Sequence, residues 1–307
     1  MRLLLLGASG FLGRHVSAAA ESDADIVLIA HVRSQPAAAG ESFALDLLEA
    51  SPGQIRDVIA SARPTAVVNC TGAVTGDASR LRQLNVDLVE RLLAATTEAT
   101  PGARFVQLGS SAEYGSVPRG QPISEAAEAQ PVSPYGETKL EATRLVVAAG
   151  ERGADAVVLR VFNPIGPGMS PATLPGRAAR AFTQAREQRL PAVEFGPLDA
   201  WRDFVDARDV ADAVLVAARA AGRLPPIINI GSGSAVQART VVRALAAIAG
   251  FTGRVVEAGS ASPRSTDVPW QCASIDLARR ALGWEPRRTL EDALRHLWSG
   301  AASIRRG

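Results

Sequence analysis

Lysine, tyrosine and cysteine are nearly absent from this chain of 307 residues. One of its 33 basic residues is a lysine, Lys139, so the other 32 (33 − 1) are arginine. The chain has two tyrosines, Tyr114 and Tyr135, and two cysteines. Two cysteines cannot form the disulfide framework of a small secreted protein, and a chain of this length buries a large core without one. We therefore expect a reducing, cytoplasmic location.

Charge of one sign is also lacking, since 33 basic side chains stand against 31 acidic ones. This balance gives no drive toward nucleic acid, and no basic run is interleaved with aromatic residues. No apolar run reaches the ~18 residues that a membrane-spanning helix needs. The leucines at positions 3–6 stop at Gly7, short of the roughly 7–15 apolar residues of a signal peptide. We expect a globular, enzyme-sized protein with no membrane or nucleic-acid partner and no metal site.

Short apolar runs alternate with helical patterns through the first half of the chain. The expected strands are 3–6, 26–29, 66–69, 105–108 and 156–161, and the expected helices are 11–21, 52–62, 79–97 and 134–152. Each strand is apolar almost throughout, as it should be when both faces of a sheet are covered. Strand and helix in alternation predict right-handed crossovers, and so an α/β fold with a Rossmann-type, doubly wound parallel sheet.

The second half is less regular and is rich in proline, glycine and arginine. Helices are expected at 174–189, 206–221, 236–249 and 276–283, and the strand-like segment 227–230 should return to the main sheet. We predict a first domain over 1–162, extended by a return strand and helix near 203–249. A smaller C-terminal lobe over 163–307 should be interleaved with it.

Three glycines at intervals of three follow the first expected strand and open the first expected helix. A tight turn at Gly7 and a bare backbone at Gly10 let main-chain amides approach a pyrophosphate, which the helix N-terminus stabilises. Gly13 lets the helix pack close to the strand. A glycine-rich turn without a ligand is the alternative, but the position inside an alternating pattern favours a dinucleotide site. The predicted cofactor contacts are Gly7, Gly10, Phe11, Leu12 and Gly13.

The end of the second strand bears on the choice of cofactor. A carboxylate there favours NAD through the ribose hydroxyls, whereas an arginine favours the 2′-phosphate of NADP. The chain has no carboxylate at 30–34 but has Arg33 and Ser34, so NADP is favoured and NAD is the alternative. An ordinary surface role is the alternative for Arg33. The other predicted contacts are Asp46 and Leu47 near the adenine, and Cys70, Thr71 and Gly72 near the nicotinamide ribose.

The only lysine follows one of the two tyrosines by four residues. Tyr135 and Lys139 lie on an expected helix, where residues four apart share a face. The usual tyrosine pKa of about 10 makes a poor acid–base group, and a neighbouring cation favours the phenolate. Lysine suits this role because its charge is compact, whereas guanidinium binds as a broad fork. The pair predicts an acid–base site, and a solvated helix face is the alternative.

A hydroxyl should bind the reacting oxygen next to this pair. Ser110 follows the strand at 105–108, where ligand-facing loops leave an open parallel sheet. Ser110 is the predicted residue and Ser111 the second choice. A hydroxyl that only stabilises the turn is the alternative for either.

Together these motifs resemble the extended short-chain dehydrogenase/reductases of the NAD-dependent epimerase/dehydratase family. They comprise the glycine loop, Asp46-Leu47, Asn85-Val86, Ser110, Tyr135 with Lys139, and the segments 159–163, 202–206, 229–231 and 282–286. Segments 109–115, 133–139 and 162–168 are most similar to the GDP-4-dehydro-6-deoxy-mannose reductases. The resemblance implies NAD(P)-dependent chemistry on a nucleotide-diphosphate sugar, with the cofactor in the first domain and the substrate mainly in the second.

The resemblance also implies further contacts and a homodimer. It places the cofactor at Phe162, the substrate at Ser111, Asn163, Arg202 and Arg264, and subunit pairing at helices 79–97 and 134–152. Trp201 and Trp270 either flank a nucleotide base or pack in the core.

The residues after Ser110 narrow the reaction. Sugar-nucleotide 4,6-dehydratases of this family carry an acidic pair there, but this chain has Ser111 and Ala112, with Glu113 one place further. Elimination of water then lacks its acid and its base. A reductase needs only NADPH and a proton from Tyr135, so reduction of a 4-keto-6-deoxy sugar is predicted. The alternatives are an NAD-dependent 4-epimerase, a reductase of a non-nucleotide ketone, and a non-catalytic nicotinamide-binding regulator.

Overall fold

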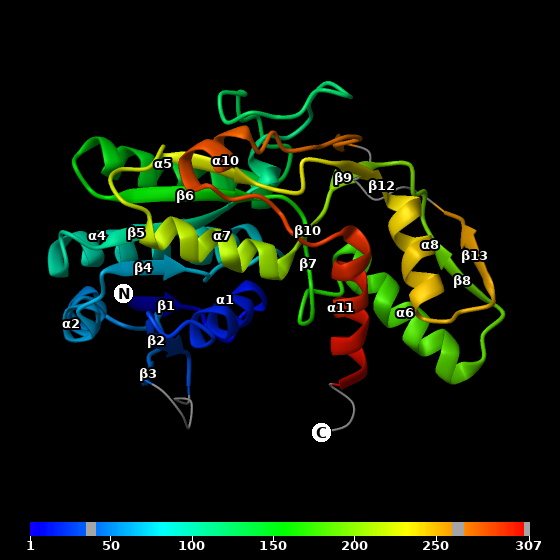
Figure 1. The fold of residues 1–307 in the computed structure, drawn as a ribbon, viewed down its shortest axis with the longest axis horizontal. Coiled ribbons are helices and arrows are strands. Elements are labelled where there is room, and N and C mark those ends of the chain that lie inside the picture. The colour runs from blue at the N-terminus through cyan, green and yellow to red at the C-terminus, as the bar shows by residue number, and fades with distance from the viewer. Residues whose placement is uncertain (35–40, 260–266, 304–307) are drawn as a thin grey trace.

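A seven-stranded sheet forms the centre of the larger lobe (Figure 1). The computed structural model describes residues 1–34, 41–259 and 267–303. The sheet has the order β11-β6-β5-β4-β1-β2-β3, and all of its pairings are parallel. Its strands are β1 (Arg2–Leu6), β2 (Val27–Val32), β3 (Glu41–Ala44), β4 (Ala66–Asn69), β5 (Arg104–Ser110), β6 (Ala156–Val161) and β11 (Ile227–Ile230). The predicted doubly wound Rossmann-type sheet is confirmed.

Two layers of helices cover the sheet. One layer contains α1 (Phe11–Glu21), α7 (Ala207–Arg219) and α10 (Asp276–Leu282), and the other contains α2 (Pro52–Ala62), α4 (Leu88–Ala99) and α5 (Pro134–Glu151) (Figure 1). Strand β1 shows why its sequence is continuously apolar: Leu3 and Leu5 pack into one core cluster, whereas Leu4 and Leu6 pack into the other. Both faces of the strand are buried, so no polar alternation is possible.

The expected helix at 79–97 differs from the structure. It is divided into α3 (Ala78–Arg82), a π-helical turn η1 (Gln83–Asp87) and α4. The sequence analysis expected one continuous helix, and a π-helical turn of this kind is a rare insertion within an α-helix. The turn carries Asn85, which is buried and lies beside the candidate site.

The smaller lobe has its own apolar core, built around α6 (Leu174–Gln188), α8 (Ala238–Ile248) and α11 (Leu290–Ser303). Three two-stranded sheets accompany these helices: β7 (Pro164–Ile165) with β10 (Val205–Asp206), β8 (Ala192–Phe195) with β13 (Arg254–Glu257), and β9 (Trp201–Asp203) with β12 (Ala235–Gln237). The chain crosses between the lobes, since β11 returns to the main sheet as predicted. Among the described residues, no helix has both the length and the apolar character to span a bilayer.

A fully buried carboxylate connects these crossings. Asp203 accepts hydrogen bonds from the backbone N–H groups of Ser232 (2.7 Å), Gly233 (3.0 Å) and Ala273 (3.0 Å). Ser232 and Gly233 lie in the turn after β11, whereas Asp203 ends β9 of the smaller lobe. One side chain therefore joins three separate stretches of chain.

Candidate active site

The glycine loop has the geometry of an anion site. Gly7 has a φ of +76°, and a Cβ on Gly13 would stand 2.1 Å from the carbonyl oxygen of Gly7. Gly10 is the N-cap of α1 and provides no side-chain cap. The first-turn N–H groups of Phe11, Leu12 and Gly13 therefore have no capping side chain to satisfy them, and a bound pyrophosphate would do so. The loop thus fits a dinucleotide.

The predicted contacts at the adenosine end lie where β2 and β3 end. Arg33 and Ser34 are both exposed just after β2. The Asp46 carboxylate accepts a hydrogen bond from the Leu48 N–H (3.0 Å), and Leu47 is buried in the core. The arginine and the hydroxyl are open to a ligand, whereas the Leu47 side chain mainly supports the loop.

The segment after β4 is held rigidly beside the glycine loop. Thr71 donates from its N–H (3.0 Å) and its hydroxyl (2.6 Å) to the Asn69 side chain. A Cβ on Gly7 would lie 3.0 Å from the Thr71 nitrogen, so the two segments are in direct contact. Burial raises the pKa of the Cys70 thiol to about 12. Cys70 is therefore a neutral packing group and not a nucleophile.

Asn85 connects the segment after β4 to α5, a role that sequence analysis missed. Its side chain accepts from the Ala73 N–H (2.9 Å) and donates to the Ala73 carbonyl (2.9 Å) and the Thr138 hydroxyl (3.1 Å). Thr138 directly precedes Lys139. The π-helical turn therefore serves to hold the expected nicotinamide end and the Tyr135–Lys139 helix together.

The predicted acid–base pair lies in the first turns of α5. Ser133 caps this helix by accepting from the Gly136 N–H (3.1 Å), and Pro134 provides the first helical residue. Tyr135 is half-buried, whereas Lys139 is buried and donates from Nζ to the Leu108 carbonyl. Burial lowers the pKa of Lys139, and the charge of Glu113 opposes that shift.

Ser110 is brought to the same place because the N-terminus of α5 packs on the turn that follows β5. A Cβ on Gly136 would stand 2.5 Å from the Ala112 carbonyl, within the 3₁₀ turn η2 (Ser111–Glu113). Ser110 is the last residue of β5, and its Oγ accepts from the Ala112 N–H (3.2 Å). Its single hydroxyl proton can then be donated to a substrate oxygen.

Glu113 lies beneath this turn and is fully buried. Its carboxylate accepts from the Ser110 N–H (2.7 Å), the Thr143 hydroxyl (2.8 Å) and Arg160 Nε (2.7 Å). The only acidic residue near the serine loop in sequence is therefore committed to an ion pair with Arg160, itself buried in β6. It fixes the loop, because its carboxylate oxygens are occupied by these three donors. Sequence analysis missed this pair because 47 residues separate its members.

Two residues predicted to touch ligands are placed differently by the structure. The Phe162 ring is fully buried and packs against the Tyr114 ring (6.1 Å between centroids), so it has no surface to offer a cofactor. Ser111 is also buried, and its carbonyl accepts from the Gln271 amide (2.9 Å). The backbone of Ser111 therefore joins the serine loop to the segment around Gln271.

The remaining substrate predictions fall at the junction of the lobes. Asn163, with a φ of +23°, donates to the Asp203 carbonyl (2.8 Å). Arg202 is buried and donates to the Trp201 carbonyl (2.7 Å). Arg264 lies outside the described residues. These contacts place Asn163 and Arg202 near each other along β9 and the loop after β6.

Trp201 and Trp270 lie on stretches of chain that pair with each other. Trp270 is buried and forms a parallel bridge with Trp201. The Arg119 guanidinium lies over the Trp201 ring, 5.4 Å from its centroid. Packing therefore accounts for Trp270 and for one face of Trp201.

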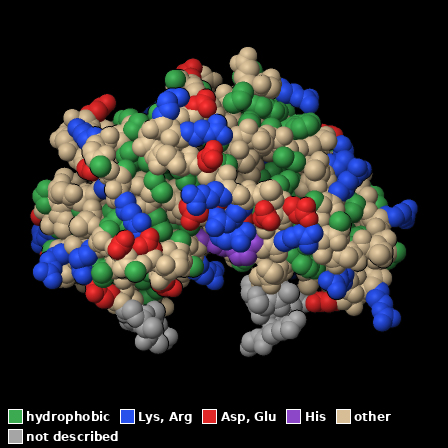
Figure 2. Space-filling model, in the orientation of Figure 1, with side chains coloured by type: hydrophobic (Ala, Val, Ile, Leu, Met, Phe, Trp, Pro, Cys, Tyr) green, Lys and Arg blue, Asp and Glu red, His purple; other side chains and the backbone are tan. Residues whose placement is uncertain are grey.

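A hollow between the lobes lies on the face shown in Figure 2, with histidine side chains beneath a group of Lys and Arg side chains. His15 of α1 contacts His296 of α11 (5.6 Å between ring centroids) and bonds through Nε2 to the Pro167 carbonyl (3.1 Å). Burial is the largest cause that lowers the pKa of both histidines. The helix that begins at the glycine loop is thus in contact with the smaller lobe.

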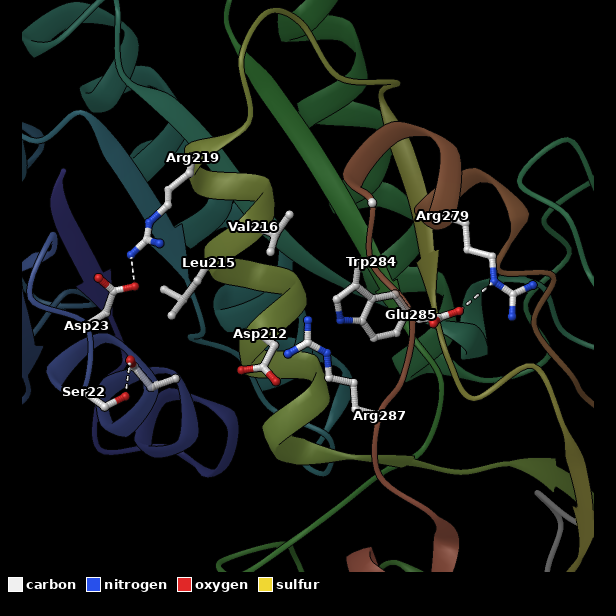
Figure 3. A pocket seen from close by; sticks show the side chains of 12 residues that line it. Ser22, Asp23, Asp212, Leu215, Val216, Arg219, Arg279, Trp284, Glu285 and Arg287 are labelled. Atoms are coloured by element: carbon white, nitrogen blue, oxygen red, sulfur yellow. Dashed lines mark hydrogen bonds and ion pairs between the residues drawn. The ribbon is translucent and has the colours of Figure 1, made fainter.

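A cavity of about 660 Å³ is separate from these residues. It is lined by the C-terminal part of α1, by α7, and by residues in and just after α10 (Figure 3). Ser22 and Asp23 lie at the end of α1 opposite the glycine loop. Arg219 forms an ion pair with Asp23, and Arg279 forms one with Glu285. Much of the charge that lines the cavity is therefore neutralised by these pairs. None of the predicted site residues that the structure describes lines this cavity.

Comparison with known proteins agrees with this arrangement. Residues 3–231 match the NAD dependent epimerase/dehydratase family. The chain is 37% identical over 306 residues to dTDP-6-deoxy-L-talose 4-dehydrogenase (NAD(P)(+)) from Kitasatospora kifunensis, covering 98% of this chain and 96% of that protein. The structure is similar to RMD from Pseudomonas aeruginosa complexed with NADPH (TM-score 0.85, 27% identity, 99% of both chains).

A second solved structure, MoeE5 in complex with UDP-glucuronic acid and NAD, is equally similar in fold (TM-score 0.85, 28% identity). The alignment covers 99% of this chain and 100% of that one. The family match, the sheet order and the full-length coverage agree. The chain therefore belongs to the NAD dependent epimerase/dehydratase family and is an NAD(P)-dependent enzyme of the extended short-chain dehydrogenase/reductase type.

Proposed function

We propose that this enzyme reduces the keto group of a nucleotide-diphosphate 4-keto-6-deoxy sugar, with NADPH as the reductant. The observation that carries the proposal is the packing of the first turns of α5, which hold Tyr135 and Lys139, against the end of β5 and the turn after it, where Ser110 lies. The 37%-identical relative is a dTDP-6-deoxy-L-talose 4-dehydrogenase, whose name describes oxidation at the same sugar position. Reduction of a 4-ketone is that chemistry in reverse.

Each of the three side chains has a distinct part. When bound, the nicotinamide supplies the hydride. Tyr135 donates its phenolic proton to the carbonyl oxygen as that oxygen becomes a hydroxyl. Lys139 favours the resulting phenolate by its positive charge, and Ser110 donates a hydrogen bond to the same oxygen. The Leu108 carbonyl holds Lys139 Nζ in place, and Asn85 ties the segment after β4 to Thr138, the residue before Lys139.

The buried Glu113 supports reduction over dehydration. A 4,6-dehydratase needs an acid and a base beside the sugar. Ser111 and Ala112 do not titrate usefully, and the Glu113 carboxylate is occupied by Ser110, Thr143 and Arg160.

The exposed pair Arg33 and Ser34 supports NADPH as the reductant. A guanidinium and a hydroxyl that follow β2 suit a 2′-phosphate, and β2 itself ends without a carboxylate that would bind the ribose hydroxyls of NAD. On the substrate side, Arg202 and Asn163 are proposed to bind the nucleotide diphosphate.

A panel of nucleotide-diphospho-4-keto-6-deoxy sugars tests the proposal, beginning with the dTDP-linked compounds. We expect NADPH to be consumed in proportion to the sugar, as measured by the loss of cofactor absorbance, and NMR to show a new hydroxyl at C4. If the purified enzyme instead interconverts 4-epimers with no added cofactor, it is a 4-epimerase. If it reduces ketones that carry no nucleotide equally well, the proposed substrate class is wrong.

A further inference from the structure

One imidazole links the glycine loop to the adenosine end of the proposed cofactor site. His31 lies in β2 and is 5% exposed. Its Nδ1 accepts a hydrogen bond from the Gly7 N–H (3.2 Å), and its Nε2 lies 2.8 Å from the Leu45 carbonyl oxygen. The side chain therefore connects the exit of β1 with the exit of β3, across the strand that lies between them (Figure 1).

These two partners allow a single tautomer. A backbone N–H can only donate, so Nδ1 facing Gly7 must be unprotonated. A carbonyl can only accept, so Nε2 facing Leu45 must carry the proton. If the ring gained a second proton, an Nδ1–H would face the N–H of Gly7, and that hydrogen bond would be lost.

The surroundings keep the ring neutral. Burial is the largest cause that lowers the pKa of His31. The charge of Arg33 lowers it further, whereas the Leu45 carbonyl and the charge of Asp46 raise it. The Phe43 ring packs against the imidazole (5.2 Å between centroids), and the Ala8 N–H donates to the His31 carbonyl (3.2 Å). Arg33 and Asp46 are the charged groups that change the pKa of the His31 ring.

We propose that His31 is a positioning residue for the cofactor. Its Nε2–H tautomer holds Gly7 and Leu45 at fixed positions before the dinucleotide arrives, and binding weakens when the imidazole gains a second proton. Gly7 opens the loop that faces the pyrophosphate, and Leu45 precedes the predicted adenine contact Asp46. The inference rests on the cofactor site of the proposed function, but it concerns binding alone and not the reaction or the sugar.

Affinity for NAD⁺ as a function of pH tests this role. NAD⁺ is the probe because it lacks the 2′-phosphate of NADP⁺, which itself titrates near pH 6. Because the fold lowers the pKa of His31, calorimetry of the native enzyme from about pH 8 downward should show a dissociation constant that is unchanged at first and rises only once the pH is below about 6.5. In His31→Gln, the constant should be about tenfold higher at pH 8 and nearly independent of pH. His296→Gln, which removes a histidine far from β2, should keep the native pH profile.

A second measurement needs no bound cofactor. Imidazole ¹⁵N NMR of the cofactor-free native protein at neutral pH should show one histidine fixed as the Nε2–H tautomer, and that signal should vanish in His31→Gln. A mixture of tautomers for His31, or identical affinity profiles of the native enzyme and His31→Gln, would overturn the inference alone. If the native enzyme binds neither NAD⁺ nor NADP⁺ at pH 8, the cofactor site itself is wrong and both proposals fail. If NAD⁺ binds but no keto sugar is reduced, only the proposed function fails.

Discussion

Gly13 faces Gly7 so closely that a Cβ on Gly13 would stand 2.1 Å from the Gly7 carbonyl oxygen and 2.9 Å from its carbonyl carbon. The third glycine of the loop therefore contacts the first directly. Because Gly13 has no side chain, α1 can pack closely against the end of β1.

Gly13→Ala should therefore weaken both the fold and cofactor binding. The methyl group must displace backbone, so we expect a loss of unfolding free energy of about 2 kcal/mol or more and NADP⁺ binding weaker by at least about tenfold. Urea unfolding and calorimetry measure these effects. Gly53→Ala in α2 is the matched control: its Cβ would meet no atom closer than 3.9 Å, and the change should stabilise by about 0.5–1 kcal/mol. Equal behaviour of the two variants would contradict the close contact.

Tyr135→Phe should remove the proton donor and little else. Turnover should fall by about 10²–10⁴-fold because general acid–base catalysis contributes about that much, whereas the dissociation constant for NADP⁺ should change little. The chain offers one other tyrosine as a control, Tyr114, whose hydroxyl donates to Asn229 (2.8 Å) within the core. Tyr114→Phe should cost about 1 kcal/mol of stability and keep most of the activity. Near-normal turnover in Tyr135→Phe would refute the mechanism.

Lys139→Met should separate activity from stability. A folded-state pKa below the usual lysine value means that folding disfavours the charged form, so the ammonium destabilises the protein at neutral pH. The unfolding free energy of the native enzyme should rise as pH increases from the lowered pKa toward about 10.4, the usual value. At pH 7, Lys139→Met should be at least as stable as the native enzyme in thermal melts and should lose at least about 100-fold in turnover. A strongly destabilised Lys139→Met would contradict this reading of the buried charge.

Glu113→Gln should destabilise the fold strongly, because it leaves Arg160 buried without its ion pair. The expected cost is about 3–5 kcal/mol in urea unfolding. The double substitution Glu113→Leu with Arg160→Met should recover much of that loss, since a well-packed apolar pair can replace a buried salt bridge. If Glu113→Gln instead left stability unchanged and abolished turnover, Glu113 would be a catalytic group and the assignment as a reductase would need revision.

Acid should weaken the folded state through the histidines. Burial lowers the pKa of His15, His31 and His296 in the fold, so the unfolded chain takes up protons first as pH falls below about 6.5. Stability should be full above that pH and decline progressively below it. Urea unfolding at about pH 7.5 and pH 5.5 measures the decline, and His15→Gln combined with His296→Gln should reduce it. A pH-independent unfolding free energy in the native enzyme would contradict this expectation.

The sequence predicted the sheet well because the physics there is local. A strand such as β1 is buried on both faces, so its four consecutive leucines were enough to predict it. The expected helix 134–152 agrees with α5 within one residue, because Ser133 and Pro134 mark its start clearly. The expected strand 105–108 was too short, because β5 extends to Ser110 and makes that serine its last residue.

The site was harder to predict where it depends on distant partners. Tyr135 and Lys139 are four residues apart in α5, so helix geometry alone predicts that they share one face. The pairs Glu113–Arg160 and His31–Gly7 each join a strand residue to a turn that follows another strand. The residues around each member give no sign of its partner. Phe162 follows a strand next to the site, yet its ring lies in the core. The sequence could not predict this, because the direction of one side chain depends on its packing partners.

The buried Asp203 carboxylate, which joins three stretches of chain, means that the two lobes of this enzyme should not fold as separate fragments. Its partners after β11 and at Ala273 belong to stretches that follow β9, so a fragment ending at residue 162 would lose an outer strand of the parallel sheet and helix α7 together. The apolar face that α7 covers would then meet water. Transplanting the smaller lobe between relatives to change sugar preference would fail for the same reason, whereas exchanging individual loops would leave the carboxylate and its donors in place.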